Sequence, residues 1–325
     1  IAIYEKKKNT LILARDRTGI KPLFYSVIQN KLFFASEIKA LFEVPLIKKT
    51  PNFASFDSFF SLKNVPAPET SFKNIYQINA GEILIFDKYG LKKKRFWEIN
   101  TSKINSNSLN VNAKNILDTL NDSVKIRMRS DVEVGAFLSG GLDSSAVCHL
   151  ANEYSKKKLK TFTLTYGSEH LKKTDDRNFA KIISKKLNTE HYELEINTKK
   201  VLSELDESLH AFDQPFGGVI SSYYLSKYMS RYVKTCLSGD GADELFGSYK
   251  FPRLISSNYN NAKINNLQLS KIKDDTLNFN SKERIHLINK LNKNLNLKNI
   301  KYYKKVLDSH NCDDLLNKSL LLDFK

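Results

Sequence analysis

The fold class of this chain rests on one segment, Phe137-Leu138-Ser139-Gly140-Gly141-Leu142-Asp143-Ser144-Ser145. The apolar run that leads into it, residues 132–138, predicts a buried strand. Beyond it, apolar residues recur from Leu142 to Tyr154 at the spacing of a helix. A loop between a strand and a helix N-terminus predicts an anion site, because exposed backbone N–H groups and the helix dipole both favour negative charge.

The side chains of this loop suit a phosphate and a cation together. Gly140 and Gly141 let a phosphate approach the backbone without meeting a Cβ atom. Hydroxyl donors are supplied by Ser139, Ser144 and Ser145. Asp143 would repel a phosphate by itself, so its presence predicts a Mg²⁺ ion between the carboxylate and the phosphate oxygens.

The motif differs from the common P-loop, because no Gly-x-x-x-x-Gly-Lys pattern followed by Ser or Thr occurs. The pattern Ser-Gly-Gly-x-Asp-Ser-Ser resembles instead the pyrophosphate loop of the ATP pyrophosphatases, which cleave ATP between the α and β phosphates. The alternative is an ordinary strand–turn–helix connection with glycines for tight packing. Three serines and an aspartate in register favour the nucleotide site.

A second loop of the same kind occurs later in the chain. Residues 233–237 predict a short buried strand that leads into Ser238-Gly239-Asp240-Gly241-Ala242-Asp243-Glu244. Ligands of open parallel sheets bind at the carboxyl ends of the strands. We therefore expect two loops on neighbouring strands to hold one nucleotide, with Asp143 and Asp243 sharing the metal. The alternative is a solvated acidic turn, although clustered carboxylates need a cation or solvent.

The length and composition limit the classes of protein to which this chain can belong. The 325 residues suffice for two domains, and no apolar run is long enough for a transmembrane helix. The net charge of +17 comes almost entirely from scattered lysines, since arginine occurs only nine times. Because arginine does most bidentate phosphate and base recognition, we expect no specific nucleic-acid partner. The lack of a long apolar run leads us to expect no membrane partner either. The widely separated cysteines favour a reducing, cytoplasmic compartment: Cys148, Cys236 and Cys312.

Residues 1–98 predict a β-rich first domain. Its strands are expected at residues 1–4, 11–14, 23–28, 31–35, 81–86 and 91–97. One short helix is expected after Ser36 as its N-cap, and another over residues 53–60. Residues 99–112 are rich in Asn and Ser and predict an interdomain linker.

From residue 113 the pattern changes, and predicted strands alternate with predicted helices. A helix marked by apolar residues from Ile116 to Met128 comes first. The strands after it are predicted at 132–138, 159–165, 191–196 and 233–237. The helices between them are predicted at 142–155, 177–187, 201–212 and 223–232. This alternation predicts an α/β fold with a doubly wound parallel sheet.

Four motifs in order resemble one family. The loops at residues 139–145 and 237–247 are similar to those of the synthetase domain of glutamine-hydrolysing asparagine synthetases. Residues 13–25 and 34–41 resemble the second half of that family's glutaminase domain. The resemblance implies that 1–98 are the truncated part of an N-terminal-nucleophile α+β sandwich and that 99–112 are a linker. Residues 113–325 would then be an adenine-nucleotide α-hydrolase-like ATP-pyrophosphatase domain, also cut short at its end.

The resemblance also implies an activity. Members of the family use ATP to convert the side-chain carboxylate of aspartate into β-aspartyl-AMP, and ammonia displaces AMP to give asparagine. In the full-length protein the ammonia comes from glutamine. The implied cofactors are ATP and Mg²⁺, the implied partners are aspartate and glutamine or ammonia, and the expected assembly is a homodimer in the cytoplasm.

By motif position, the resemblance assigns roles to residues. Residues 139–145 would cradle the pyrophosphate, and Asp143 and Asp243 would hold Mg²⁺. The adenosine would contact Leu138, Leu164, Ser238 and Gly239. Asp240 falls where many members carry a glutamate that handles the proton of ammonia, and aspartate is one methylene shorter.

Two departures from the family keep alternatives open. The cysteine nucleophile of the glutaminase is missing, since no cysteine precedes Cys148. Residues 213–218 are similar to the family's Asp-Glu-Pro-Phe stretch but lack an acidic residue common there. The alternatives are a relative that amidates another carboxylate, such as a cell-surface sugar or a peptide, a nucleotide-dependent RNA modifier, and a non-catalytic remnant.

Overall fold

The computed structural model describes residues 1–99, 106–166 and 176–247, together with 283, 286 and 287. Two compact units divide these residues between them. Of the three long ranges, the first unit holds 1–99 and 212–217, and the second holds 106–166, 176–211 and 218–247. Between residues 211 and 218 the chain leaves the second unit for the first unit and then returns to it.

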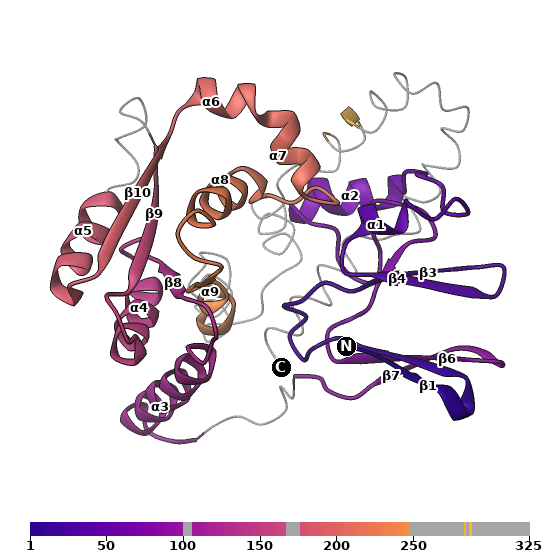
Figure 1. Cartoon of the computed structure of the whole chain (residues 1–325), viewed down its shortest axis with the longest axis horizontal. Helices are drawn as coiled ribbons and strands as arrows, with labels where there is room; N and C mark the ends of the chain where they lie inside the picture. The colour runs from indigo at the N-terminus through magenta and orange to yellow at the C-terminus, as the bar shows by residue number, and fades with distance from the viewer. Residues whose placement is uncertain (100–105, 167–175, 248–282, 284–285, 288–325) are drawn as a thin grey trace, which may run out of the picture. The chain divides into compact units, whose positions relative to one another are not determined.

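A parallel four-stranded sheet forms the centre of the second unit (Figure 1). Its spatial order is β10 (Glu190–Ile196), β9 (Lys160–Tyr166), β8 (Val134–Phe137) and β11 (Thr235–Leu237). All three strand pairs are parallel. The prediction of an α/β fold with a parallel sheet is confirmed. The order reverses at β8, because β9 and β10 lie on one side of it and β11 lies on the other.

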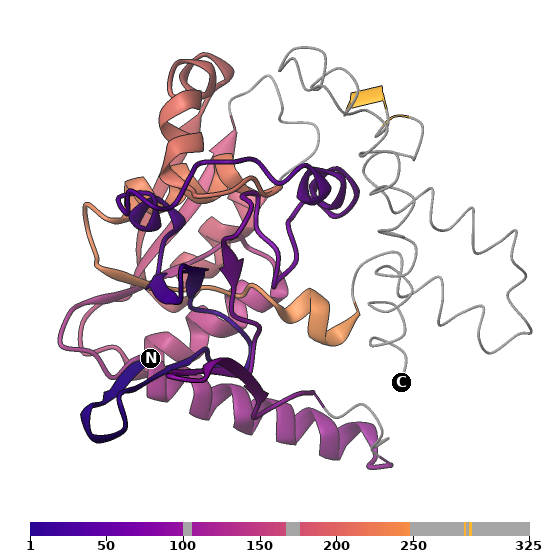
Figure 2. The same ribbon diagram turned by 90° about the vertical axis from the view of Figure 1, so that its right-hand side faces the viewer.

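Three helices pack on one face of this sheet: α3 (Leu109–Arg127), α4 (Leu142–Tyr154) and α5 (Asp176–Leu187). α3 is seen along its length in Figure 2. The core on this face consists of small and branched apolar side chains: Val124, Val134, Ala136, Leu138, Val147, Cys148, Leu150, Ala151, Leu159, Ala180 and Leu237. Val134 and Ala136 of β8, and Leu138 directly after the strand, belong to this core, as expected of a strand with period two.

The opposite face of the sheet carries aromatic side chains and α8 (Val219–Met229). The ring of Phe162 on β9 lies 6.4 Å from that of Tyr228 and 5.8 Å from that of Tyr232. Tyr223 and Tyr224 are buried in the middle of the helix. Both faces of the sheet are thus covered by helices, which is the arrangement that parallel strands require.

Three helix boundaries differ from those predicted. α3 begins at Leu109 because the Ser108 side chain accepts a hydrogen bond from Val111 N, so the last four residues of the predicted linker are helical. The single helix predicted over 201–212 is two helices, α6 (Thr198–Ser203) and α7 (Leu205–Ala211). Glu204 interrupts them with non-helical backbone angles. α8 begins four residues before the predicted Tyr223.

The first unit contains two antiparallel sheets. The four-stranded sheet has the order β1 (Ala2–Glu5), β2 (Thr10–Ala14), β6 (Glu82–Asp87) and β7 (Gly90–Arg95). The three-stranded sheet has the order β4 (Lys31–Ala35), β3 (Phe24–Ile28) and β5 (Tyr76–Gln77). A core that includes Leu13, Tyr25 and Leu84 joins the two sheets. The predicted strands and the closing hairpin are confirmed, and membership of the N-terminal-nucleophile class stays a prediction.

Within residues 1–99, the α-helices are α1 (Ile38–Leu41) and α2 (Phe53–Leu62). The prediction that Ser36 caps α1 is wrong, because the N-cap residue is Glu37. The Glu37 side chain makes no capping hydrogen bond. The backbone N–H groups of Ile38 and Lys39 donate instead to the carboxylate of Asp213. A cap that lies this far away along the chain leaves no local signal in the sequence.

Gly135 in β8 gives a first testable prediction. A Cβ atom there would lie 2.8 Å from Phe162 Cε2 and 3.1 Å from Cys236 Sγ. We expect Gly135→Ala to lower the free energy of unfolding by about 1–3 kcal/mol through overpacking, as measured by urea denaturation. The control is Glu153→Ala, at an exposed position of α4, whose effect should stay within about 0.5 kcal/mol. Equal stability of the two variants would contradict the packing described for β8.

Within the described residues, no helix is long and apolar enough to cross a membrane. The two cysteines of this part, Cys148 and Cys236, are free thiols. Burial raises the pKa of each to about 12, so both stay protonated near neutral pH.

Candidate active site

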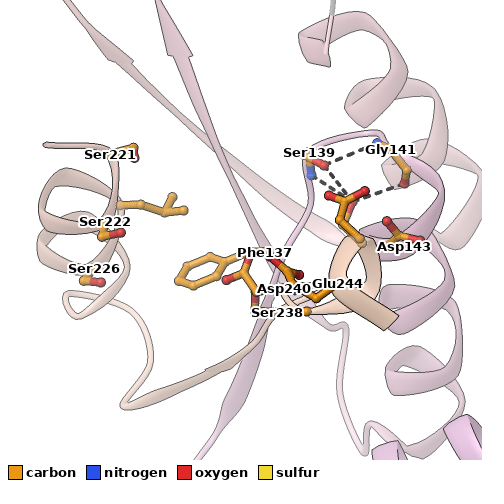
Figure 3. A pocket seen from close by; sticks show the side chains of 15 residues that line it. Phe137, Ser139, Gly141, Asp143, Ser221, Ser222, Ser226, Ser238, Asp240 and Glu244 are labelled. Atoms are coloured by element: carbon orange, nitrogen blue, oxygen red, sulfur yellow. Dashed lines mark hydrogen bonds between the residues drawn. The ribbon is translucent and has the colours of Figure 1, made fainter. Parts of the chain in front are cut away.

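A cavity of about 720 Å³ lies at the carboxyl ends of β8 and β11, and all its lining residues belong to the second unit (Figure 3). Three segments line it: the end of β8 with the loop and first helical turn after it, residues 221–226 of α8, and the loop after β11 with the start of α9 (Ala242–Phe246). The point where the strand order reverses is where open α/β sheets bind ligands. The cavity therefore lies at the sheet edge where the two loops were expected to meet.

The loop after β8 is held by its own serines. Ser139 N donates to Ser144 Oγ at 3.2 Å, and the two hydroxyl oxygens lie 2.9 Å apart. Ser144 Oγ also donates to Gly141 O at 3.2 Å, and Gly141 N donates to Ser139 Oγ at 3.3 Å. Gly140 has a φ of +85°, which favours glycine. Hydrogen bonds within the loop thus shape it before any ligand arrives.

The same loop opens α4, a helix of 13 residues. Its N-cap is Gly141, which has no side chain to satisfy the first backbone N–H groups. Asp143 is the acidic residue of the first turn and lines the cavity. Unsatisfied N–H groups and the helix dipole suit a phosphate at this position.

The loop after β11 lies against the first turn of α4. A Cβ atom on Gly239 would lie 2.8 Å from Ser144 N and 3.0 Å from the carbonyl carbon of Asp143. Only glycine fits at this position, because the Cβ atom of any other residue would meet backbone atoms of α4. The loop is further shaped by a hydrogen bond of 3.1 Å from Asp240 N to Ser238 Oγ. The two predicted loops are therefore neighbours in space, as their strands are in the sheet.

Eight of the predicted site residues line the cavity: Ser139, Gly141, Asp143, Ser144, Ser238, Gly239, Asp240 and Asp243. The other four do not appear on its wall. Leu138 is fully buried in the core beneath the loop, Gly140 forms the turn, and Leu164 lies within β9. Ser145 Oγ is buried, with no hydrogen-bond partner in the described structure.

Carboxylates dominate the charge of the cavity. Four of them line it, Asp143, Asp240, Asp243 and Glu244, and no lysine, arginine or histidine is among the lining residues described. Nowhere in the described ranges do three His, Cys, Asp or Glu side chains form a cage for a metal ion. Oxygen donors in small number fit Mg²⁺, which proteins usually bind through one or two carboxylates together with substrate phosphates.

Sequence reasoning missed the wall formed by α8. Ser221, Ser222 and Ser226 of α8 line the cavity, across from the loop at Ser139, as Figure 3 shows. Because the helix was expected to begin at Tyr223, the first two serines were outside it. Helical spacing from residue 219 onward would have placed these serines on one side and the buried tyrosines on another.

Two family models match the chain. The model described as asparagine synthase covers residues 115–324, and the model described as glutamine amidotransferase domain covers residues 1–97. A putative asparagine synthetase (glutamine-hydrolyzing) 2 of Methanocaldococcus jannaschii is 35% identical over 256 residues, which are 76% of this chain and 48% of that protein. Asparagine synthetase (glutamine-hydrolyzing) 1 of Bacillus subtilis is 32% identical over 258 residues, 77% of this chain and 39% of that protein.

A solved structure is also similar, the NH3-dependent NAD synthetase of Campylobacter jejuni, at 15% identity. The match covers 60% of this chain and 92% of the NAD synthetase chain. Its TM-score is 0.30, and a score this low supports no inference. The chain spans less than half the length of the two curated relatives. The asparagine synthase match extends over well more than half of the chain and includes both loops of the cavity. On that match, the chain belongs to the asparagine synthase family.

Proposed function

We propose that this chain carries the ATP-dependent amidation of aspartate to asparagine through β-aspartyl-AMP, with glutamine as the source of ammonia in the complete protein. The observation that carries the proposal is the cavity built by the two loops after β8 and β11. It combines a helix N-terminus suited to phosphate with carboxylates suited to a divalent cation. Membership of the asparagine synthase family supports the same chemistry.

Different residues of the cavity would bind different parts of ATP and its metal ion. The backbone N–H groups at the start of α4, with the hydroxyl of Ser139, would hold the pyrophosphate portion of ATP. Asp143 and Asp243 would hold Mg²⁺, which when bound neutralises charge that develops on the leaving pyrophosphate. Ser238 and Gly239 would contact the adenosine. The hydroxyls of Ser139 and Ser144 bond to each other in the ligand-free loop, so both also shape it, and the Ser139 hydroxyl would turn from Ser144 to the phosphate when ATP binds.

The finer assignments are part of the proposal. Residues 1–98 would be part of an N-terminal-nucleophile glutaminase domain, 99–112 the linker, and 113–325 the adenine-nucleotide α-hydrolase-like domain. We propose a homodimer in the cytoplasm, with aspartate and glutamine or ammonia as its small-molecule partners.

The test of the function uses the complete protein and measures pyrophosphate release from ATP with ammonia. We expect release to depend on aspartate and to yield asparagine and AMP. Sugar acids and peptide carboxylates are offered in parallel at the same concentration. Release that depends on one of those acceptors and not on aspartate would replace the proposed substrate, and no release with any acceptor would reject the ligase.

Asp240 gives a prediction that separates the two half-reactions. We expect Asp240→Asn to lower ammonia-dependent asparagine formation about 100-fold, since an amide cannot accept the proton of the attacking ammonia. Aspartate-dependent exchange of labelled pyrophosphate into ATP should persist, because this exchange precedes the attack. Asp240→Glu is the matched variant and should keep most of the activity. A full rate of asparagine formation in Asp240→Asn would contradict the role in proton transfer.

A further inference from the structure

Within the second unit, α8 has two sides that face different surroundings. The side toward the cavity is formed by four lining residues: Ser221, Ser222, Leu225 and Ser226. The other side bonds to α6 and α7 through Tyr224 and Lys227. At about 3.6 residues per turn, Tyr224 and Lys227 fall on the side of the helix opposite to the lining residues. Contacts behind the helix can therefore decide where this wall of the cavity lies.

The Lys227 ammonium joins α8 to α7 and to the break before α7. Its Nζ atom donates to Glu207 Oε1 at 3.0 Å and to the hydroxyl of Tyr223, on its own helix, at 2.8 Å. It also lies 3.6 Å from Oε2 of Glu204, the residue that separates α6 from α7. The hydrogen bonds to Tyr223 and Glu207 raise the pKa of Lys227 above its usual value, so the side chain stays charged.

Glu204 is the partner that most needs this cation. Its side chain is 28% exposed, against 60% for Glu207. Its Oε2 atom is buried and, in the part of the chain that the structure describes, accepts no hydrogen bond. Removing one partner of a buried ion pair leaves an uncompensated charge, which costs far more than losing an exposed pair. Without Lys227, the Glu204 carboxylate would have to reach water, and its contact with α8 would open.

α6 in turn is fixed to the parallel sheet. β10 ends at the buried Ile196, and Asn197 caps the helix that follows by accepting a hydrogen bond from Lys200 N at 2.9 Å. The hydroxyl of the buried Tyr224 donates to Lys200 O at 3.0 Å. α8 is therefore bonded to a helix that starts at the carboxyl end of a strand, the same edge of the sheet at which the cavity lies.

We propose that Lys227 is a positioning residue of the cavity, which pairs with Glu204 and Glu207 and so holds α8 at the distance from the loop after β8 that ATP requires. Lys227 is not among the residues that line the cavity, so it acts through the placement of the helix. The inference rests on the proposed function in that the cavity is taken to bind ATP. Its structural part, the dependence of α8 on Lys227, can be tested without any nucleotide.

The test compares four variants of the complete protein with the wild type. Lys227→Met removes the charge and keeps a flexible apolar stem, whereas Lys227→Arg retains a cation. Lys227→Met combined with Glu204→Gln also removes the buried negative charge. Lys160→Met is the matched control, because Lys160 pairs with Glu133 at 2.8 Å at the amino end of β9, on the edge of the sheet away from the cavity.

Hydrogen exchange of the peptide that covers α8 is measured first, without ligand. We expect it to be about 10-fold faster in Lys227→Met, close to the wild-type rate in Lys227→Arg, and unchanged in Lys160→Met. The double variant should exchange about threefold more slowly than Lys227→Met alone, since a neutral glutamine needs no cation. A wild-type rate in Lys227→Met, or an equal rise in Lys160→Met, would overturn the proposal. A double variant that exchanges no more slowly than Lys227→Met would overturn the part assigned to Glu204.

Kinetics is measured second, as KM for ATP in aspartate-dependent pyrophosphate exchange. We expect KM to rise about 10-fold in Lys227→Met with kcat within about twofold, to recover in Lys227→Arg, and to stay unchanged in Lys160→Met. An unaltered KM in Lys227→Met, beside faster hydrogen exchange, would overturn the link to the cavity. A wild type without any pyrophosphate exchange would reject the proposed function, whereas hydrogen exchange would still decide whether Lys227 holds α8.

Discussion

Asp143→Asn is expected to reduce aspartate-dependent ATP turnover by about 1000-fold, the scale of losing a main electrostatic element of a site. Asp143 lies in the first turn of α4 and lines the cavity beside the loop that would hold the phosphates. The substitution keeps the size of the side chain but removes the charge that would bind Mg²⁺. The measurement is pyrophosphate release by the complete protein at saturating aspartate and ammonia.

The control for Asp143→Asn comes from the same helix. Glu153→Gln removes one negative charge near the other end of α4, where the carboxylate is exposed and lies 3.6 Å from His149 Nε2. It should leave turnover within about twofold of the wild type, since exposed charge pairs contribute little. If Asp143→Asn turned over ATP at the rate of this control, the metal role of Asp143 would be wrong. A titration with Mg²⁺ separates weaker metal binding from loss of chemistry, because only the former is restored by excess metal.

Gly239→Ala is expected to weaken ATP binding about 100-fold, because the added methyl group would lie 2.8 Å from Ser144 N. The neighbouring atoms are backbone of the first turn of α4, which cannot rotate away as the end of a side chain could. The two loops must then separate, and the N–H groups that would face the phosphates move with them. ATP affinity is measured by isothermal titration calorimetry with the complete protein and Mg²⁺.

The matched comparison for Gly239→Ala is a second glycine of the same cavity. A Cβ atom on Gly141 would meet only Ser139 Oγ, at an ordinary contact distance of 3.4 Å, and its φ of −69° suits any residue. Gly141→Ala should therefore weaken ATP binding much less than Gly239→Ala. Equal losses in the two variants would mean that the close approach of the loops is unimportant for the nucleotide. Circular dichroism of both variants checks that neither has unfolded.

Local patterns predicted most of the secondary structure. The strands of the parallel sheet and the helices α4 and α5 lie within a few residues of their expected positions, because each has a clear apolar period and a flanking turn. Boundaries were wrong where a side-chain cap or a backbone break decided them. Ser108 and Asn197 begin α3 and α6 earlier than the apolar residues indicate, through hydrogen bonds to Val111 N and Lys200 N.

The candidate site, too, could be predicted from the sequence only in part. Its two loops could be predicted because glycine, serine and aspartate stand in a short, recognisable order after each strand. The third wall could not, since Ser221, Ser222 and Ser226 are ordinary surface residues until α8 is placed beside the loops.

Neighbouring residues were enough to predict the parallel sheet and the position of its two loops, because both are carried by groups a few positions apart in the chain. Three-dimensional packing alone established that Gly239 lies against Ser144 and that Asp213 caps a helix 175 positions earlier in the chain. Neither contact leaves a local trace, since each depends on where distant segments come to lie after the sheets have formed. A hydrophobic period specifies an element and its buried face, whereas backbone contact between loops depends on packing of the whole unit.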